Sequence, residues 1–234
     1  MSRQAQQLIA QAKAEGWKRL DLGKCDLTDL ETQVPELFEL TNLEELVLSN
    51  VWYEWNEATQ KWELKRSSNI GEENYLSKLP KRLSNLKNLK VLICGGSYGN
   101  NWEISDYSVV KQLPQLTHLN LCGNKLTKIE NLDKLPNLQF LNLSDTKITE
   151  IENLDNLPIL QELDLSVNEI TKLENLDNLS NLQKLDLSWN KIINIENLDN
   201  LPILQILDLS WNKIINIENL DNLPILPEMC KVLW

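Results

Sequence analysis

The sequence predicts an α/β solenoid, in which successive coils share one parallel β-sheet. Residues 182–203 read LQKLDLSWNKIINIENLDNLPI, and the next stretch of equal length repeats them with one change, from Lys184 to Ile206. A fixed period of this length is typical of solenoids, whose repeats bury an apolar face against their neighbours. Looser copies come before, so five units of 22 residues keep one register over 116–225, with starts at Leu116, Leu138, Leu160, Leu182 and Leu204.

Residues 1–16 are expected to form an N-terminal capping helix. Ala5, Leu8, Ile9 and Ala12 share one helical face, and Gly16 is a plausible stop. Because the first coil of a solenoid exposes an apolar end, a helix at this place would cover it. A helix that binds a partner is the alternative interpretation.

Residues 17–234 are expected to form one repeat domain, whose first coils begin at Trp17, Leu43 and Leu89. Insertions at 51–75 and 97–112 interrupt the second and third coils. Residues 51–64 alternate aromatic and polar residues around a polar centre, which predicts a β-hairpin. The last unit begins at Leu226 without a visible cap, so either the native chain continues or this end packs against something, such as a second copy in a homodimer.

Each repeat follows the pattern L-x-x-L-x-L-x-x-N. The middle leucines alternate along a short strand and share its buried face. The asparagine ends the strand, and its amide is expected to bond backbone groups of the turn and of the next coil. Thr146 and Cys25 replace it in two coils, while Val51 and Ser97 mark the interrupted coils, where this ladder should be weakest. The regular ladder residues are Asn124, Asn168, Asn190 and Asn212.

Charge and hydropathy exclude several classes of protein. The formal charge of −11 argues against nucleic acid and anionic lipid, which need basic patches, and is compatible with a basic partner. No apolar run reaches the roughly 18 residues of a membrane span. The N-terminus lacks the apolar core of a signal peptide, so the expected compartment is the cytoplasm.

The sequence offers no catalytic, metal or cofactor site. Its cysteines, Cys25, Cys94, Cys122 and Cys230, share no C-x-x-C spacing and are expected to be reduced thiols. His118 is the single histidine, so no imidazole pair or histidine-centred triad can form within one chain. The Gly-rich stretch 94–100 lacks the P-loop lysine. Repeated Glu and Asp residues on the returns are interpreted as a solvated polar face.

These repeats resemble the leucine-rich repeat family over nearly the whole chain. The unit with its IENLDNLPxL return is similar to the short-repeat subtype of internalins and of a regulatory subunit of protein phosphatase one. The opening, EGWKRLDLGKCDLTDL, resembles the repeat segment of bacterial Roco-type proteins, where repeats precede a GTPase module. The resemblance implies a curved solenoid with its parallel sheet on the concave face and short helical, 3-10 or extended returns on the convex face. It also implies binding of other proteins and no catalysis by the repeats.

Three functions are compatible with this resemblance. The first is a non-catalytic module of a bacterial cytoplasm that binds a protein or peptide on its concave face and ascending edge. The second is the recognition segment of a larger signalling enzyme, similar to a Roco GTPase, whose catalytic part is absent. The third is a secreted or surface effector or adhesin, which the missing signal peptide weakens.

Outward strand positions provide the first candidate partner-binding surface. Asp164, Asp186 and Asp208 form an acidic row beside Trp189 and Trp211. Like charges on neighbouring strands repel, and exposed tryptophan is enriched at binding hot spots. We therefore expect a basic or mixed segment, anchored by the tryptophans. The alternative is that recent duplication copied one Trp and one Asp without selection for contact. The same face carries Phe140, Val167 and Ile206.

The aromatic insertions provide a second candidate surface. The hairpin carries Trp52, Trp55 and Trp62, and the next insertion carries Trp102. Both insertions leave after a strand in adjacent coils, so they are expected at the same edge of the sheet. Loops on a rigid scaffold commonly carry function. The alternative is that the insertions pack on each other and cover a defective stretch of the ladder.

Overall fold

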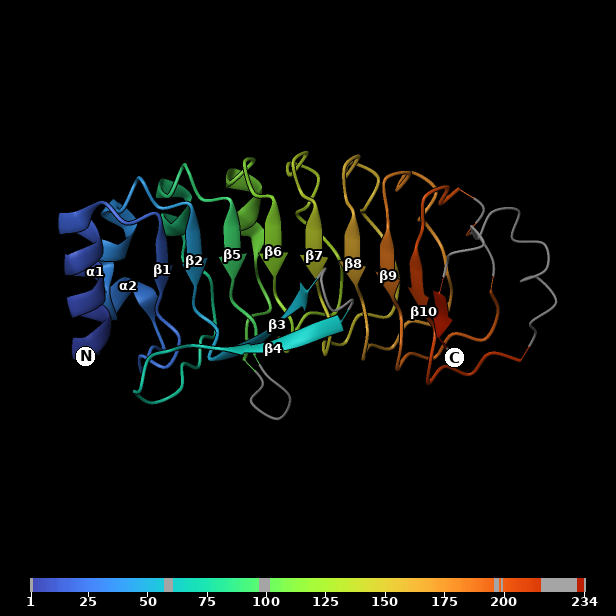
Figure 1. The fold of residues 1–234 in the computed structure, drawn as a ribbon, viewed down its shortest axis with the longest axis horizontal. Helices are drawn as coiled ribbons and strands as arrows, with labels where there is room; N and C mark the ends of the chain where they lie inside the picture. Colours follow the sequence, from blue (N-terminus) through green and yellow to red (C-terminus); the bar gives the residue numbers. More distant parts are fainter. Residues whose placement is uncertain are drawn as a thin grey trace.

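The computed structural model describes residues 2–56, 61–96, 102–195, 198, 200–215 and 231–233, and the side chains of 53–56, 61, 62 and 231–233 lie outside this description. Within these residues nine short strands form one parallel sheet along the long axis of the molecule (Figure 1). In sheet order they are β1 (Arg19–Asp21), β2 (Glu45–Val47), β5 (Val91–Ile93), β6 (His118–Asn120), β7 (Phe140–Asn142), β8 (Glu162–Asp164), β9 (Lys184–Asp186), β10 (Ile206–Asp208) and β11 (Lys231–Leu233).

The strands pair in the register that the repeat predicts. Leu163 lies opposite Leu185, and Leu185 lies opposite Leu207, so equivalent leucines meet across β8, β9 and β10. The last strand differs from the prediction. Lys231, and not Glu228, lies opposite Ile206, so β11 starts three positions later than a constant period allows. This shift places a β-branched valine, which favours a strand, opposite Leu207.

Helix α1 (Arg3–Glu15) covers the first coil, as predicted. The Ser2 hydroxyl accepts a hydrogen bond from the Ala5 N–H, and Gly16 ends the helix in the left-handed conformation. Ala5, Ile9 and Ala12 are buried in the same core as the leucines of the first coil. In Figure 1 the helix stands at the end of the sheet beside β1. No helix in the described ranges has the length and apolarity to cross a bilayer.

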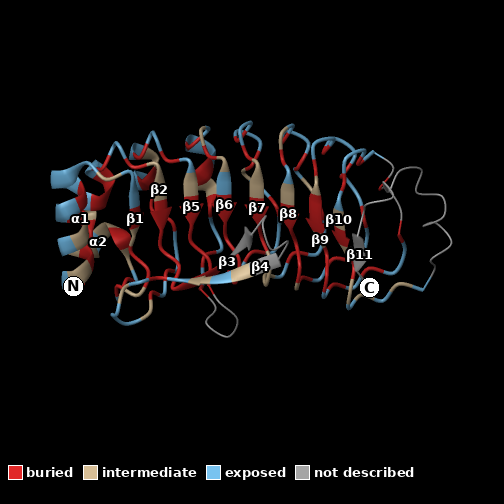
Figure 2. Cartoon of the chain, in the orientation of Figure 1, coloured by how far each residue is buried: buried red, intermediate tan, exposed pale blue. Residues whose placement is uncertain are grey.

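The returns take both of the predicted forms. Among the described residues, the returns of the first three coils contain short helices, and later returns consist of turns and extended segments. Their leucines and isoleucines fill the space behind the sheet, as the buried interior in Figure 2 shows. The short helices are α2 (Leu30–Gln33), η1 (Pro35–Glu39), η2 (Lys81–Asn85) and η3 (Ser108–Gln112).

The asparagine ladder is confirmed in the regular coils. The Asn190 amide donates to the carbonyls of Leu165 and Leu187, and its oxygen accepts from the Ile170 N–H. One side chain therefore satisfies buried backbone groups of two coils. Asn124, Asn168 and Asn212 make equivalent bonds.

In the second coil the ladder residue is Asn74 and not Val51. The expectation that the ladder is weak in this coil was therefore wrong. Asn74 is fully buried and donates to the carbonyls of Leu22 and Leu48. Its oxygen accepts from the N–H groups of Cys25 and Leu27. The first insertion therefore interrupts the repeat directly before its ladder residue, and the ladder is intact on its far side. The motif N-x-L at this position could have revealed this, because the ladder residues of the regular coils stand in N-x-L or N-x-I.

The first insertion forms an antiparallel hairpin of β3 (Val51–Asn56) and β4 (Lys61–Arg66), which confirms the prediction. Trp52 packs against Val47 and Ile93, which point outward from β2 and β5. The base of the hairpin therefore lies on the outward face of the sheet. The prediction had placed this insertion at the edge of the sheet instead. The reason is apolar burial, since from β1 to β10 these outward positions are hydrophobic only in the second and third coils. In Figure 1 the hairpin extends along the solenoid toward the later strands.

Candidate functional site

Trp189 and Trp211 lie one coil apart and stack on each other. Their ring centroids are 4.7 Å apart and their planes are inclined by 16°. The side chains stay 54% and 69% exposed, respectively. Two neighbouring indoles on a rigid sheet therefore present a large apolar surface to solvent, as the register predicts.

Both tryptophans stand in a backbone conformation that favours glycine. Their φ angles are +56° and +58°, and the equivalent residues of two other coils are Gly123, at φ +63°, and Val167, at φ +54°. A residue with a side chain costs about 1 kcal/mol or more in this left-handed region. The backbone is held by the ladder, since the Trp189 N–H donates to the Ser210 carbonyl of the next coil. Folding alone gives no reason for indoles at this strained, exposed position.

The acidic row is less exposed than predicted. Asp164, Asp186 and Asp208 lie opposite each other on β8, β9 and β10, but Asp164 is only 7% exposed and the other two are half-buried. The physical reason lies in the next turn. Each carboxylate accepts from the N–H and the hydroxyl of the serine two residues later. The carboxylates of the row thus end their strands, which gives them a role in the fold itself.

Crowding of these carboxylates changes their acidity. Burial raises the pKa of Asp164, although hydrogen bonds from Ser166 and Asn142 oppose the change. Burial and the neighbouring Asp164 raise the pKa of Asp186 to about 7. Near neutral pH the row therefore carries less negative charge than three free carboxylates would.

The outward row two residues before the acidic row carries two more predicted residues of this face. Phe140 and Ile206 are half-buried on β7 and β10, and the Phe140 ring stacks on His118 with centroids 5.9 Å apart. Between them, the ammonium of Lys184 pairs with Glu162 at 2.7 Å in a largely buried ion pair. Val167 is half-buried in the row of the tryptophans. The structure thus brings these predicted residues together over β7 to β10.

The aromatic residues of the insertions do not join this surface. Trp52, at the base of the hairpin, is only 4% exposed, and Trp102 is fully buried in the core. Trp102 has the ladder position of the third coil, and its Nε1 has no partner among the described residues. Neither tryptophan is available to a partner, which corrects that prediction. Trp55 and Trp62 lie opposite each other in the hairpin, but their side chains, like all of Ser97, lie outside the described residues.

Two exposed isoleucines extend the apolar surface, and the sequence reasoning did not select them. Ile193 and Ile215 are 43% and 81% exposed, four residues after each tryptophan. The three preceding coils carry Thr127, Thr149 and Thr171 at this position. A change from threonine to isoleucine, in the same two coils that gain tryptophan, was the signal that could have revealed them.

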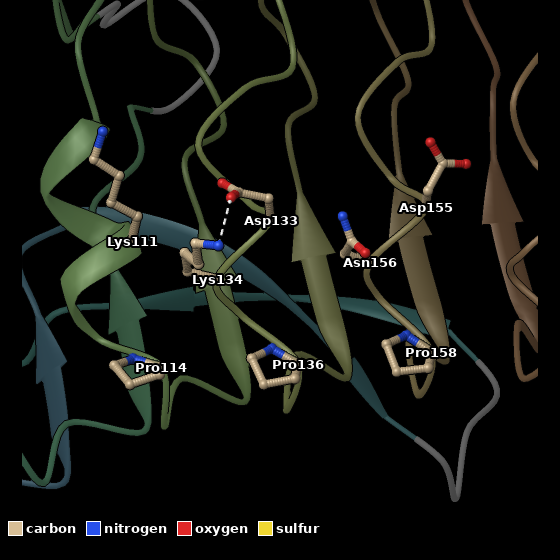
Figure 3. A pocket seen from close by; sticks show the side chains of 8 residues that line it. All are labelled: Lys111, Pro114, Asp133, Lys134, Pro136, Asp155, Asn156 and Pro158. Carbon is tan, nitrogen blue, oxygen red and sulfur yellow. Dashed lines mark ion pairs between the residues drawn. The ribbon is translucent and has the colours of Figure 1, made fainter.

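A hollow of about 670 Å³ lies on the returns that lead into β6, β7 and β8. Figure 3 shows Pro114, Pro136 and Pro158 along one side, with Lys111 and the ion pair of Asp133 and Lys134 near them. These prolines repeat with the coils, and no predicted site residue lines the hollow. It is a product of the repeat, separate from the tryptophan surface.

The described residues hold no recognisable catalytic centre. Within the described ranges no three His, Cys, Asp or Glu residues are placed to bind a metal ion. Cys25, Cys94 and Cys122 are buried free thiols, and burial raises the pKa of each, for Cys25 to about 12. Cys230 lies outside the described part. Thiols of this kind are poor nucleophiles.

Comparison with known proteins identifies the repeat. A family model described as leucine-rich repeats (two copies) matches residues 114–156, and a leucine-rich repeat model matches 178–194 and 200–216. No curated protein matches the chain in sequence.

Solved structures share the fold. Internalin C2 of Listeria monocytogenes is 27% identical with a TM-score of 0.68, and the match covers 95% of this chain and 83% of that one. Internalin InlF of the same organism is 24% identical with a TM-score of 0.67, covering 92% and 52%. A leucine-rich repeat protein of Leptospira interrogans is 28% identical with a TM-score of 0.60, covering 93% and 60%. The chain thus spans about half the length of InlF.

Proposed function

Because the chain is a leucine-rich repeat protein, we propose that it is a non-catalytic module that binds a protein or peptide partner. A repeat solenoid presents an extended and rigid surface, and it gains specificity from the outward residues of successive coils. The buried thiols and the single histidine support a role without chemistry of its own.

The site of this proposal is the sheet face over β8 to β10 together with its tryptophan edge. The stack of Trp189 on Trp211 carries the proposal, because it exposes two large apolar rings at a strained backbone position. Tryptophan is among the residues most enriched at binding hot spots. The face over β2 and β5 is less suited, since Trp52 already covers Val47 and Ile93.

The partner of this surface is a basic or mixed segment. Asp186 and Asp208 are half-exposed beside the tryptophans, and the chain carries a formal charge of −11. Such a surface attracts cationic groups and repels nucleic acid and anionic membranes.

Affinity capture from a lysate of the source organism tests the site. Wild type is compared with the double variant Trp189→Ala/Trp211→Ala, and bound proteins are identified by mass spectrometry. Ile203→Ala is the matched control, because Ile203 is an exposed apolar residue of the same coils at the other end of the strands. We expect a partner that wild type and control retain and the double variant loses. A partner that all three proteins retain would contradict the proposed site.

Two further parts of the proposal concern the state of the protein in the cell. The buried, unpaired thiols support a reducing compartment, which is the cytoplasm in our proposal. An end-to-end homodimer through β11 is the second candidate interaction, because among the described residues β11 pairs with β10 alone. Light scattering over a range of concentrations distinguishes a monomer from such a dimer.

A further inference from the structure

The tryptophan stack has one open end. Trp211 of the following coil stacks on Trp189, and Val167 has the equivalent backbone position in the preceding coil. Trp211 has Trp189 against one ring face, and it is the more exposed of the two, at 69% against 54%. The ring face of Trp211 that points away from Trp189 is therefore the more accessible end of the stack.

A carboxylate lies on the same coil as this open face. Asp208 ends β10 three residues before Trp211, and its Oδ1 accepts from the N–H and the hydroxyl of Ser210. The described residues donate no hydrogen bond to its Oδ2. In Asp164, by contrast, the Asn142 amide donates to Oδ2. One carboxylate oxygen of Asp208 therefore has no hydrogen-bond partner among the described residues.

The charges around Asp208 favour a cation on the sheet side of the stack. Lys184 of β9, the cation of this face, is engaged by Glu162 at 2.7 Å. Asp186, also on β9, is the neighbouring acid, and its carboxylate accepts from Ser188. Lys191 and Lys213 stand two residues after the tryptophans, beyond the ends of β9 and β10, and Lys191 pairs with Glu169. A cationic group at the strand side of Trp211 is therefore favoured by the carboxylates of β9 and β10.

We propose that the open face of Trp211 receives an arginine side chain of the partner, with Asp208 as its counter-charge. This proposal rests on the binding function above and names the chemistry of the segment that binds. A guanidinium is planar, so it lies flat on an indole while its N–H groups bond a carboxylate. An ammonium group cannot do both with the same geometry. An exposed indole three residues after a carboxylate, one oxygen of which has no donor among the described residues, fits this pair of contacts.

Short synthetic peptides test the proposal without knowledge of the partner. The probe has arginine at every third position in a Gly-Ser background, and a second peptide has lysine at the same positions. A third peptide with glutamate controls for charge. Titration is followed by tryptophan emission and by calorimetry at low ionic strength.

We expect the arginine peptide to bind more tightly than the lysine peptide and the glutamate peptide not to bind. Trp211→Ala should weaken the arginine peptide about fivefold, the effect of a cation–π contact of about 1 kcal/mol. Asp208→Asn should weaken it too, while Ile203→Ala should leave it unchanged. Thermal unfolding of each variant shows whether the fold is kept.

Equal affinity of the arginine and lysine peptides, or unchanged affinity in Trp211→Ala, would overturn the arginine site. So would the absence of binding by any peptide. The lysate experiment separates this failure from that of the proposed function: a partner lost by the tryptophan double variant would keep the binding surface and remove only the arginine contact.

Discussion

Asp164 and Asp186 lie directly opposite each other on the adjacent parallel strands β8 and β9. Each carboxylate ends its strand by accepting hydrogen bonds from the serine two residues later. In the preceding coil Asn142 makes the same bonds to Ser144 and donates its amide to Asp164. An acidic residue, Asp, and a neutral one, Asn, thus occupy the same structural position in different coils, and mutation can compare them.

Asp186→Asn should stabilise the protein increasingly as pH rises. Burial and Asp164 raise the pKa of Asp186 to about 7, so the folded state holds a proton that the unfolded chain releases near pH 4. The wild type therefore loses stability as pH rises from about 4 to about 7. The variant should gain roughly 1–2 kcal/mol relative to wild type over this window. Urea unfolding at a series of pH values measures the difference.

The reverse change is the matched control for this prediction. Asn142→Asp adds a carboxylate beside Asp164 and removes the amide donor, so it should destabilise the protein most at high pH. Parallel stability–pH curves for wild type and Asp186→Asn would contradict the assignment of the raised pKa to this row.

Asn74→Ala should destabilise the protein by about 3 kcal/mol. It leaves two buried carbonyls, of Leu22 and Leu48, and two N–H groups, of Cys25 and Leu27, without their partner. Asn88→Ala removes an exposed amide bond to the Thr41 carbonyl and should cost less than about 1 kcal/mol. The midpoint of urea unfolding compares the two variants, and equal shifts would show that the ladder does not depend on Asn74.

Trp211→Gly should change the free energy of unfolding by less than about 1 kcal/mol. The lost stack with Trp189 contributes about 0.5–1.5 kcal/mol, and relief of the left-handed backbone at φ +58° offsets it by a similar amount. Thermal and urea unfolding measure this balance. A loss of more than about 3 kcal/mol would mean that the indole serves the fold and not a partner.

The buried cysteines should not react with a thiol reagent in the native state. Cys25, Cys94 and Cys122 are buried, and their thiolates are disfavoured by burial. Cys230→Ser provides the background, since Cys230 lies outside the described residues. In this background Ellman's reagent should react only slowly with the native protein. After unfolding in guanidinium it should react with all three thiols. Rapid native reaction would show that the coils open locally.

The expectations about exposure failed at residues that another part of the chain covers. The repeat register places Trp52 and Trp102 in insertions, which suggests exposure. Their burial depends on long-range partners: Val47 and Ile93 for Trp52, and the solenoid core for Trp102. A register says which way a residue points within its own coil, but not what folds over it.

The sequence by itself determined the architecture. The fixed period sets the parallel register from β6 to β10, the alternating leucines set the buried face, and the ladder asparagines follow from the need to pair buried backbone groups. It also determined that Trp189 and Trp211 meet, because residues one period apart are neighbours in a solenoid. These features are local to one coil or shared by adjacent coils, so periodicity is enough to predict them.

Only the tertiary structure decided which outward residues remain available. It covers Val47 with the hairpin, ties the carboxylate of Asp164 into the next turn and moves the second ladder position to Asn74. The physical reason is that exposure is a property of all atoms around a side chain, including those that an insertion brings back from elsewhere. Trp189 and Trp211 stay open because no described segment packs over their coils.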